Sequence, residues 1–313
     1  MKRIVSMLMA VAFPLCCFFS GCSKKGGSTV TPTGTTVNPS TTTSATTTTT
    51  TVPTTTGVTF PGAEEFSFTA EQEEELNTLI SSYEGHVSVI YYDAGSGYQY
   101  QYNNVHSYFA ASIIKAPFCL YILQMAERGE TDLNETMEYT EEFYTTGTGV
   151  IKKEPYGTVY TKKTLVEYAL CHSDNIAFKM LRTAYPPEGF KEYARSIGIK
   201  DINGIKNVSS SNITADDALT YMKEIFKYIS TKSDLAKFME ENMLRTVNPM
   251  IRASYPVVRK YGWSTGAYHD IAIIQAPRPY ILIILSDHSK GSKADNEMFR
   301  TISKKIESFS GNK

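Results

Sequence analysis

The sequence has almost no excess of charge of either sign. Its 31 lysines and arginines balance 32 aspartates and glutamates, for a formal net charge of −1. A chain without a basic or acidic surplus gives no reason to expect nucleic acid or a charged surface as its partner. No residues show metal-ligand spacing and no glycine-rich loop suits a nucleotide, so we expect no metal and no cofactor.

Cysteine is also scarce. Three of the five cysteines, Cys16, Cys17 and Cys22, lie in the first two dozen residues, which leaves Cys119 and Cys171 for the rest of the chain. Each of these two lies in an apolar, helix-like run, which is typical of a buried free thiol. A disulfide between them stays open as an alternative, because the sequence does not place their Cα atoms.

A hydrophobic run long enough to cross a membrane is missing near the N-terminus. Lys2 and Arg3 precede an apolar stretch at 4–20, which Pro14 interrupts. The stretch falls short of the roughly 20 residues that a membrane span needs. The layout therefore predicts a secretory signal peptide at 1–21 rather than an anchor helix.

The residues Phe19-Ser20-Gly21-Cys22 resemble the lipobox of bacterial lipoproteins. The resemblance implies a lipid on Cys22 that anchors the protein to the bacterial cell membrane, outside the cytoplasm. The segment 22–63 is rich in threonine, serine and proline and has too little apolar surface to fold by itself. We expect it to be a disordered linker, with glycosylation of its threonines left open, in front of a folded domain at 64–313.

Helical and strand patterns follow one another in an informative order in the folded part. Periodicity predicts helices at 69–83, 112–127 and 294–309, strands at 86–92, 98–102, 257–264, 270–275 and 280–285, and a helix-rich middle. Because the strands fall at both ends of the domain, the simplest fold is α+β. It has a five-stranded, mainly antiparallel sheet with flanking terminal helices and an inserted all-helical subdomain at about 110–250.

A serine and a lysine three residues apart open the second predicted helix, in Ser112-Ile113-Ile114-Lys115. Residues three apart share a helix face, so the lysine amine can lie beside the serine hydroxyl. If burial lowers the pKa of the lysine, its neutral amine can accept the hydroxyl proton. Taken alone, the pattern favours the ordinary alternative of a helix cap and a solvated charge.

Two further triplets gain meaning from their order and spacing. Ser173-Asp174-Asn175 lies 61 residues after Ser112, in the helical middle, and Ser264-Thr265-Gly266 lies another 91 residues on, at the end of a strand. A polar cap and a strand-to-turn transition are their ordinary alternatives. Together the three motifs resemble the S-x-x-K, S-D-N and K-T-G set of class A β-lactamases and penicillin-binding proteins. The stretches YTEEFYTTGTGVIK and MIRASYP are similar to that family as well.

The resemblance implies a role for each residue of the first two motifs. Ser112 would be the nucleophile and Lys115 its base. Ser173 would relay a proton to the leaving nitrogen, and Asn175 would help to hold Lys115 and the substrate. The substrate would be a small-molecule β-lactam or a D-Ala-D-Ala-type peptide, which acylates the serine.

The same resemblance places substrate-binding residues at the third motif. Thr265 would bind the substrate carboxylate, flanked by Ser264 and Gly266. The backbone N–H groups of Ser112 and Ala267 would form the oxyanion hole.

Two departures from the family pattern stand out. Ser264 occupies the place of the lysine of K-T-G, and His269 is the nearest ionisable residue that could replace it, although an ordinary core or surface histidine is the favoured alternative. The stretch 193–223 contains no glutamate, whereas class A β-lactamases carry one there to activate the deacylating water. Asp201 is the acid that precedes the next helix. The match to a working β-lactamase is therefore incomplete.

Three functions follow as hypotheses. The first is a class A β-lactamase-like serine hydrolase that forms an acyl-enzyme with β-lactams, but inefficiently. The second is a penicillin-binding, D,D-peptidase-like enzyme that acts on peptidoglycan. The third is a non-catalytic module that binds cell wall or another ligand; the intact Ser112, Lys115, Ser173 and Asn175 argue against it.

Overall fold

The computed structural model describes residues 65–289 and 293–312. The predicted signal peptide, the lipidation site Cys22 and the whole of the predicted linker lie outside the described residues. Among the described residues, no helix is both long and apolar enough to cross a membrane.

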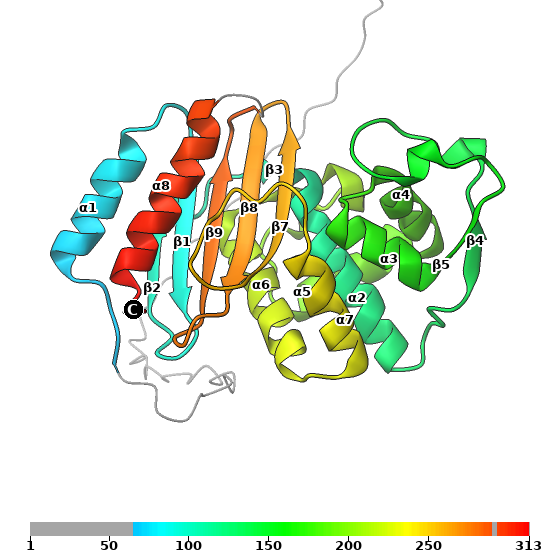
Figure 1. The fold of residues 1–313 in the computed structure, drawn as a ribbon, viewed down its shortest axis with the longest axis horizontal. Helices are drawn as coiled ribbons and strands as arrows, with labels where there is room; N and C mark the ends of the chain where they lie inside the picture. The colour runs from blue at the N-terminus through cyan, green and yellow to red at the C-terminus, as the bar shows by residue number, and fades with distance from the viewer. Residues whose placement is uncertain (1–64, 290–292, 313) are drawn as a thin grey trace, which may run out of the picture. The chain divides into compact units, whose positions relative to one another are not determined.

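One antiparallel sheet of five strands joins the two ends of the described chain (Figure 1). Its order is β2-β1-β9-β8-β7. The strands are β1 (Val87–Asp93), β2 (Gln99–Tyr102), β7 (Val257–Ser264), β8 (Ala267–Ile274) and β9 (Tyr280–Ser286). Every residue of β8 and β9 is buried, because both faces of the sheet are covered, and this explains their nearly continuous apolar sequences. The predicted α+β fold is confirmed.

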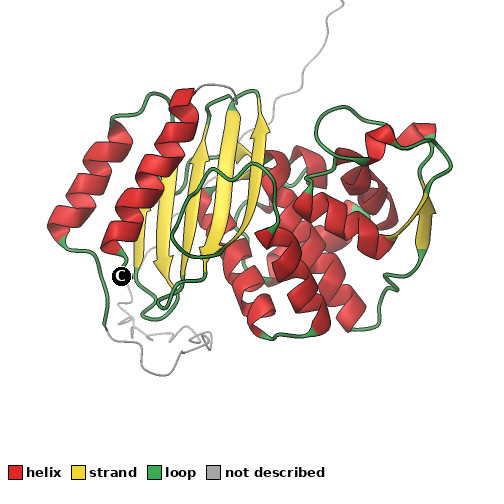
Figure 2. Cartoon of the chain, viewed as in Figure 1, coloured by secondary structure: helices red, strands yellow, loops and turns green. Residues whose placement is uncertain are grey.

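The terminal helices α1 (Ala70–Ser81) and α8 (Lys293–Phe309) pack against each other on one face of the sheet (Figures 1 and 2). Thr69 starts α1 with a capping box, in which its hydroxyl accepts from the N–H of Gln72 and the Gln72 side chain accepts from the N–H of Thr69. A core that includes Leu76, Phe299 and Ile302 fills the space between these helices and the sheet. Both chain ends therefore stabilise the same layer.

The inserted middle of the chain is mostly helical and packs around its own core. Its helices are α2 (Lys115–Glu127), α3 (Lys162–Cys171), α4 (Asn175–Ala184), α5 (Pro187–Ser196), α6 (Ala215–Ser230) and α7 (Asp234–Leu244). Short strand pairs join β3 (Tyr108–Phe109) to β6 (Asn212–Ile213), and β4 (Thr136–Glu138) to β5 (Val159–Thr161). Helix α6 packs on β1, β8 and β9 and covers the second face of the sheet.

The edge strand β7 meets the first turn of the helical part, and this contact builds the site. The turn is the 3-10 helix η1 (Ala111–Ile114), which leads directly into α2. Gly262 of β7 lies so close that a Cβ on it would be 2.7 Å from the backbone nitrogen of Ser112. Only glycine allows two backbones to approach in this way.

The two cysteines of the folded part are buried and free, so the predicted pair of thiols is confirmed and the alternative disulfide is not formed. Cys119 lies on α2 and Cys171 ends α3.

Candidate active site

Ser112 and Lys115 lie one turn apart at the start of the most buried helix of the inserted part. Lys115 is 1% exposed, and the residues that follow it on α2 as far as Leu123 are buried except Tyr121. Ala111, directly before Ser112, has a φ of 46°, in the left-handed region that favours glycine. Non-glycine residues in that region store strain, and such strain is concentrated at functional sites.

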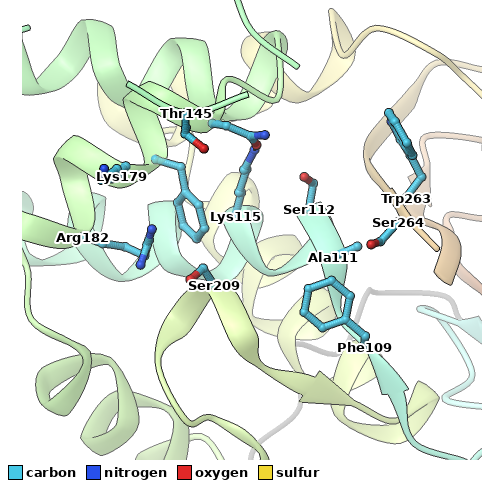
Figure 3. Close-up of a pocket in the computed structure, with 12 residues that line it drawn as sticks. Phe109, Ala111, Ser112, Lys115, Thr145, Lys179, Arg182, Ser209, Trp263 and Ser264 are labelled. Carbon is cyan, nitrogen blue, oxygen red and sulfur yellow. The ribbon is translucent and has the colours of Figure 1, made fainter. Parts of the chain in front are cut away.

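Both residues line a cavity of about 290 Å³ between η1, α4 and β7 (Figure 3). The remaining lining residues are Phe109, Ala111, Thr145, Asn175, Phe178, Lys179, Arg182, Ser209, Trp263 and Ser264. The structure thus brings together Ser112, Lys115, Asn175 and Ser264, although Ser112 and Ser264 are 152 residues apart in the sequence.

The turn between α3 and α4 presents the second motif to the cavity. Ser173 is buried with a φ of 52°, a second left-handed non-glycine residue. Asp174 holds the turn in place: one carboxylate oxygen accepts from the N–H groups of Ile176 and Ala177, and the other from those of Val150 and Ile151. Four backbone hydrogen bonds to one buried carboxylate fix the position of the motif.

The loop before α3 supports this turn from behind, and two of its glycines are required. Gly147 and Gly149 have φ values of 99° and 131°, and a Cβ on them would lie 2.4 Å from Asn175 Nδ2 and 2.3 Å from Asp174 Oδ2. This close approach gives the glycines of YTTGTGV a structural role. It also lets Thr146 accept a hydrogen bond from the Asn175 amide and Thr148 donate one to Ser173 O.

Lys115 connects the two motifs. Its Nζ donates to Ser173 O at 2.6 Å and to Asn175 Oδ1 at 2.7 Å, and it lies 3.4 Å from Ser173 Oγ. Complete burial and, next, the positive charge of Lys260 hold the pKa of Lys115 well below its ordinary value. A lysine with a lowered pKa supplies the neutral amine that a proton acceptor needs.

A second buried lysine, Lys260 of β7, reaches the same serine, and the sequence analysis did not identify it. Its Nζ donates to Ser173 Oγ at 2.9 Å and to Tyr261 O at 3.0 Å. Burial lowers the pKa of Lys260 to about 7. The prediction that serine replaces the lysine of the third motif is therefore wrong, because Lys260-Tyr261-Gly262 holds the place beside Ser173 and Ser112 that was assigned to Ser264-Thr265-Gly266.

The residues first assigned to the third motif lie further along the hairpin. Ser264 lines the cavity, but Thr265 and Gly266 form the turn between β7 and β8 and do not line it. Ala267 pairs with Ser264 as the first residue of β8, an interior strand of the sheet. The sequence did contain a signal for this: Lys260, four residues before Ser264, is a lysine within an otherwise buried strand.

His269 does not stand in for a missing lysine. It is fully buried, Nε2 hydrogen bonds to Phe109 O at 2.9 Å, and Nδ1 accepts from the N–H of Ser286 at 3.2 Å. Burial lowers the pKa of His269 to about 4. These contacts make it a neutral structural residue that ties β3 to the sheet.

The segment between α5 and α6 forms the floor of the cavity, and it contributes no acidic side chain to the lining. Ser209 lines the cavity, whereas Asp201 caps a short 3-10 turn by accepting from the N–H of Gly204 at 2.8 Å. Of the described residues that line the cavity, none is acidic. No group of described histidine, cysteine, aspartate or glutamate residues could hold a metal ion.

The model of the beta-lactamase enzyme family matches residues 71–309. The chain belongs to this family. Beta-lactamase SME-1 of Serratia marcescens is 25% identical over 256 residues, which are 73% of this chain and 84% of that protein. Beta-lactamase PSE-4 of Pseudomonas aeruginosa is 26% identical over 145 residues, which are 46% of this chain and 49% of that protein.

Solved structures agree on the fold. The structure of PBP-A is similar with a TM-score of 0.69 and 16% identity, over 76% of this chain and 95% of that chain. A beta-lactamase from Sphaerobacter thermophilus gives 0.70 and 17% identity, over 78% and 98%. A mutant of PBP-A, solved as an acyl-enzyme complex with penicillin G, also matches, at a TM-score of 0.67 and 15% identity.

Proposed function

We propose that this member of the family is an active-site-serine enzyme whose Ser112 is acylated by β-lactams and retains the acyl group. The observation that carries the proposal is the hydrogen-bonded set Lys115, Ser173 and Lys260 next to Ser112 in one cavity. Two buried lysines with lowered pKa values beside a serine pair are costly for folding, and such clusters occur at functional sites.

In the proposed acylation, Ser112 Oγ attacks the lactam carbonyl carbon while its proton passes to the neutral amine of Lys115. The C–N bond of the ring then breaks. The leaving nitrogen takes its proton from Ser173 Oγ, which is replenished from Lys115. Lys260, when charged, holds Ser173 Oγ in place and stabilises negative charge on the substrate.

The oxyanion hole follows from the register of the edge strand. In an antiparallel edge strand, alternate residues direct both their N–H and C=O groups away from the neighbouring strand. Because Tyr261 O accepts from the Lys260 amine, we infer that Tyr261 is one of the residues that direct these groups away from β8, and that Trp263, two residues further on, directs its N–H to the same side. We therefore assign the second oxyanion donor to Trp263 in place of Ala267, with Ser112 as the first.

Deacylation is proposed to be slow, because water attacking the ester needs a positioned base. Assistance by a general base is typically worth roughly 10²–10⁴-fold. The floor of the cavity offers Ser209 and no carboxylate. The same observation supports a second candidate function, a D,D-peptidase-like reaction on peptidoglycan in which Lys115 serves both steps.

Mass spectrometry of the penicillin-treated domain tests the proposal. We expect one adduct on the peptide that contains Ser112, a pre-steady-state burst with a chromogenic cephalosporin, and slow turnover afterwards. An adduct on Ser173 or Ser264 instead would contradict the assignment of the nucleophile. Complete absence of an adduct would favour a non-catalytic binding module.

The slow second step has its own test in Ser209→Glu. A carboxylate on the cavity floor should shorten the lifetime of the acyl-enzyme by about tenfold or more. Ser210→Glu is the matched control, because it adds the same charge to the exposed neighbouring residue. Equal lifetimes in wild type and Ser209→Glu would show that the missing carboxylate does not limit deacylation.

We also propose that the domain acts outside the cytoplasm, anchored by a lipid on Cys22 through the linker at 22–63. The lipobox-like sequence before Cys22 supports this. Changing Cys22 to alanine should release the protein from membranes or leave it unprocessed. Unchanged fractionation with membranes would rule out this anchor.

A further inference from the structure

The cavity next to Ser112 carries positive charge on one side. Lys179 and Arg182 lie on α4 on one flank of Ser112, and Trp263 and Ser264 of β7 lie on the other (Figure 3). None of the described lining residues is acidic. A cavity lined by one sign of charge attracts ligands of the opposite sign.

Arg182 is poorly satisfied by the described part of the protein. Its Nε is buried and has no hydrogen-bond partner there, and its guanidinium lies 5.0 Å from the ring centre of Phe178. Burial lowers the pKa of Arg182, and no carboxylate counteracts this. A planar guanidinium with unused donors is suited to bind a carboxylate through two hydrogen bonds.

On the strand side of the cavity, the side chains that could meet an anionic group are Ser264, which lines it, and Lys260, which lies beside Ser173. The residue after Lys260 is Tyr261, where the family motif has threonine, and its buried hydroxyl accepts from the side chain of Asn248. The hydroxyl that the resemblance assigns to the substrate carboxylate is thus used inside the protein.

The position of the two cations on α4 fixes which part of the substrate they face. Lys179 is one turn and Arg182 two turns beyond Asn175, so Arg182 is about 10 Å further along the helix axis. Side chains on a helix tilt towards its N-terminus, so both lean back towards Asn175 and Ser112. Ser173, the proposed proton donor to the leaving nitrogen, lies at the opposite end, so a group at Arg182 belongs to the acyl part.

We propose that Arg182 and Lys179 form a subsite for a carboxylate on the acyl part of the substrate, a few bonds from the reacting carbonyl. The proposal rests on the proposed function for the identity of the reacting carbonyl. Two sources share this chemistry, a carboxylated side chain of a β-lactam and an acidic residue of a wall peptide.

Benzylpenicillin and carbenicillin are the matched probes, because they differ by one carboxylate on the acyl side chain. We expect Ser112 to be acylated by carbenicillin with a second-order rate constant about tenfold higher, a preference that falls with added salt. Arg182→Gln should abolish most of the preference. Arg195→Gln, which removes an equal charge from an exposed position on α5, should keep it. Equal rates for the two penicillins in wild type would exclude a carboxylated β-lactam side chain as the source.

Binding to Ser112→Ala separates this subsite from the acylation chemistry. Trp263 is the only tryptophan of the chain and lines the same cavity, so its fluorescence reports ligand entry. Tighter binding of carbenicillin, lost in Ser112→Ala/Arg182→Gln, supports the subsite even if Ser112 of the wild type forms no adduct. Peptides that end in D-Ala-D-Ala and carry either a carboxylate or a carboxamide on the preceding residue identify the second source. No preference in either matched pair would exclude a carboxylate subsite.

Discussion

The two walls of the cavity are built by different means. The helical wall consists of η1 and the turn before α4. Two hydrogen bonds from the Lys115 amine join the two motifs, and four backbone hydrogen bonds to the Asp174 carboxylate hold the turn in place, all of them 3.0 Å or shorter. The strand wall is the free edge of β7, where Lys260, Gly262 and Trp263 are positioned by their register with β8.

The difference shows which features each wall must keep. On the helical wall, Lys115 is bonded to Ser173 and Asn175, and Asp174 is bonded to the surrounding backbone, so the geometry depends on the types of these side chains. On the strand wall, the positions of Lys260 and Gly262 depend on the register of β7 with β8. The residue between them is a tyrosine, yet Lys260 still contacts Ser173 and Gly262 still lies against Ser112. Five variants can break or sharpen this comparison.

The largest effect is expected on the helical wall. Lys115→Met removes the proposed proton acceptor and both bonds that join the motifs, so acylation by penicillin should fall by about 10³-fold or more. Lys227→Met, at an exposed position of α6, controls for the loss of a lysine. Adduct formation by mass spectrometry gives the rates, and near-normal labelling of Lys115→Met would assign the base to another group.

On the strand wall, Lys260→Met should lower the acylation rate by roughly 10²-fold, because Ser173 Oγ loses its charged donor. Adding Ser264→Lys to this variant tests the frame of the motif. Since Ser264 lies four residues from Lys260 on β7, we expect no rescue in the double variant. Recovery of activity would restore Ser264-Thr265-Gly266 as the third motif.

Gly262→Ala targets the contact between the walls. The added Cβ would lie 2.7 Å from the nitrogen of Ser112 and 2.8 Å from that of Ile113, so β7 must move and acylation should fall by roughly tenfold or more. Gly129→Ala, strained by a φ of 72° but surrounded by open space, controls for a general loss of stability. Equal acylation in both variants would show that the spacing of the walls is not critical.

The two walls should also give the acylation rate a bell-shaped pH dependence. The rate rises as Lys115 loses its proton, and it falls as Lys260 loses its own near pH 7, where burial sets the pKa of Lys260. Lys260→Arg stays charged at all accessible pH values and should remove the fall on the alkaline side. If the alkaline fall is the same in wild type and Lys260→Arg, another group causes it.

The smallest expected effect is that of Lys260→Met on stability. This variant should lose activity but gain stability. Burial places the pKa of Lys260 at about 7 in the folded state, below the ordinary 10.5. Between these values the unfolded chain binds more protons, so the free energy of unfolding of the wild type should rise with pH across this window. Lys260→Met should lack this rise and be more stable at pH 7 by on the order of 1 kcal/mol.

Urea denaturation at pH 7 and pH 10 measures this difference. A variant that is less stable than wild type at pH 7 and keeps the same pH dependence would show that the hydrogen bonds of Lys260 outweigh the cost of burying its charge. The strand wall would then resemble the helical wall in being stabilised by its own polar groups.

The amino-acid sequence by itself determined the class of fold and the helical wall. Strand and helix patterns at both chain ends indicated one sheet with terminal helices, and the structure confirms it. Ser112 and Lys115 share one helical turn at a spacing of three residues. That spacing alone favoured a helix cap and a solvated charge, and the order of the three motifs was needed to single the pair out. The apolar runs around Cys119 and Cys171 correctly indicated buried free thiols, because the apolar residues of a local segment show which part of a helix is buried.

Only the tertiary structure decided which residues of β7 face Ser112 and Ser173 on the strand wall. The side chains of a strand alternate between two faces, and the sequence does not say which face of an edge strand meets a helix 150 residues earlier in the chain. The resemblance to K-T-G therefore drew attention to Ser264, while the contact of Gly262 with Ser112 and the reach of Lys260 to Ser173 depended on the register of β7 and on the packing of two chain segments. The cationic flank at Arg182 could not be predicted for the same reason. A charge on a helix is normally solvated, and only the packed neighbours show that this side chain is partly buried and that its Nε has no hydrogen-bond partner among the described residues.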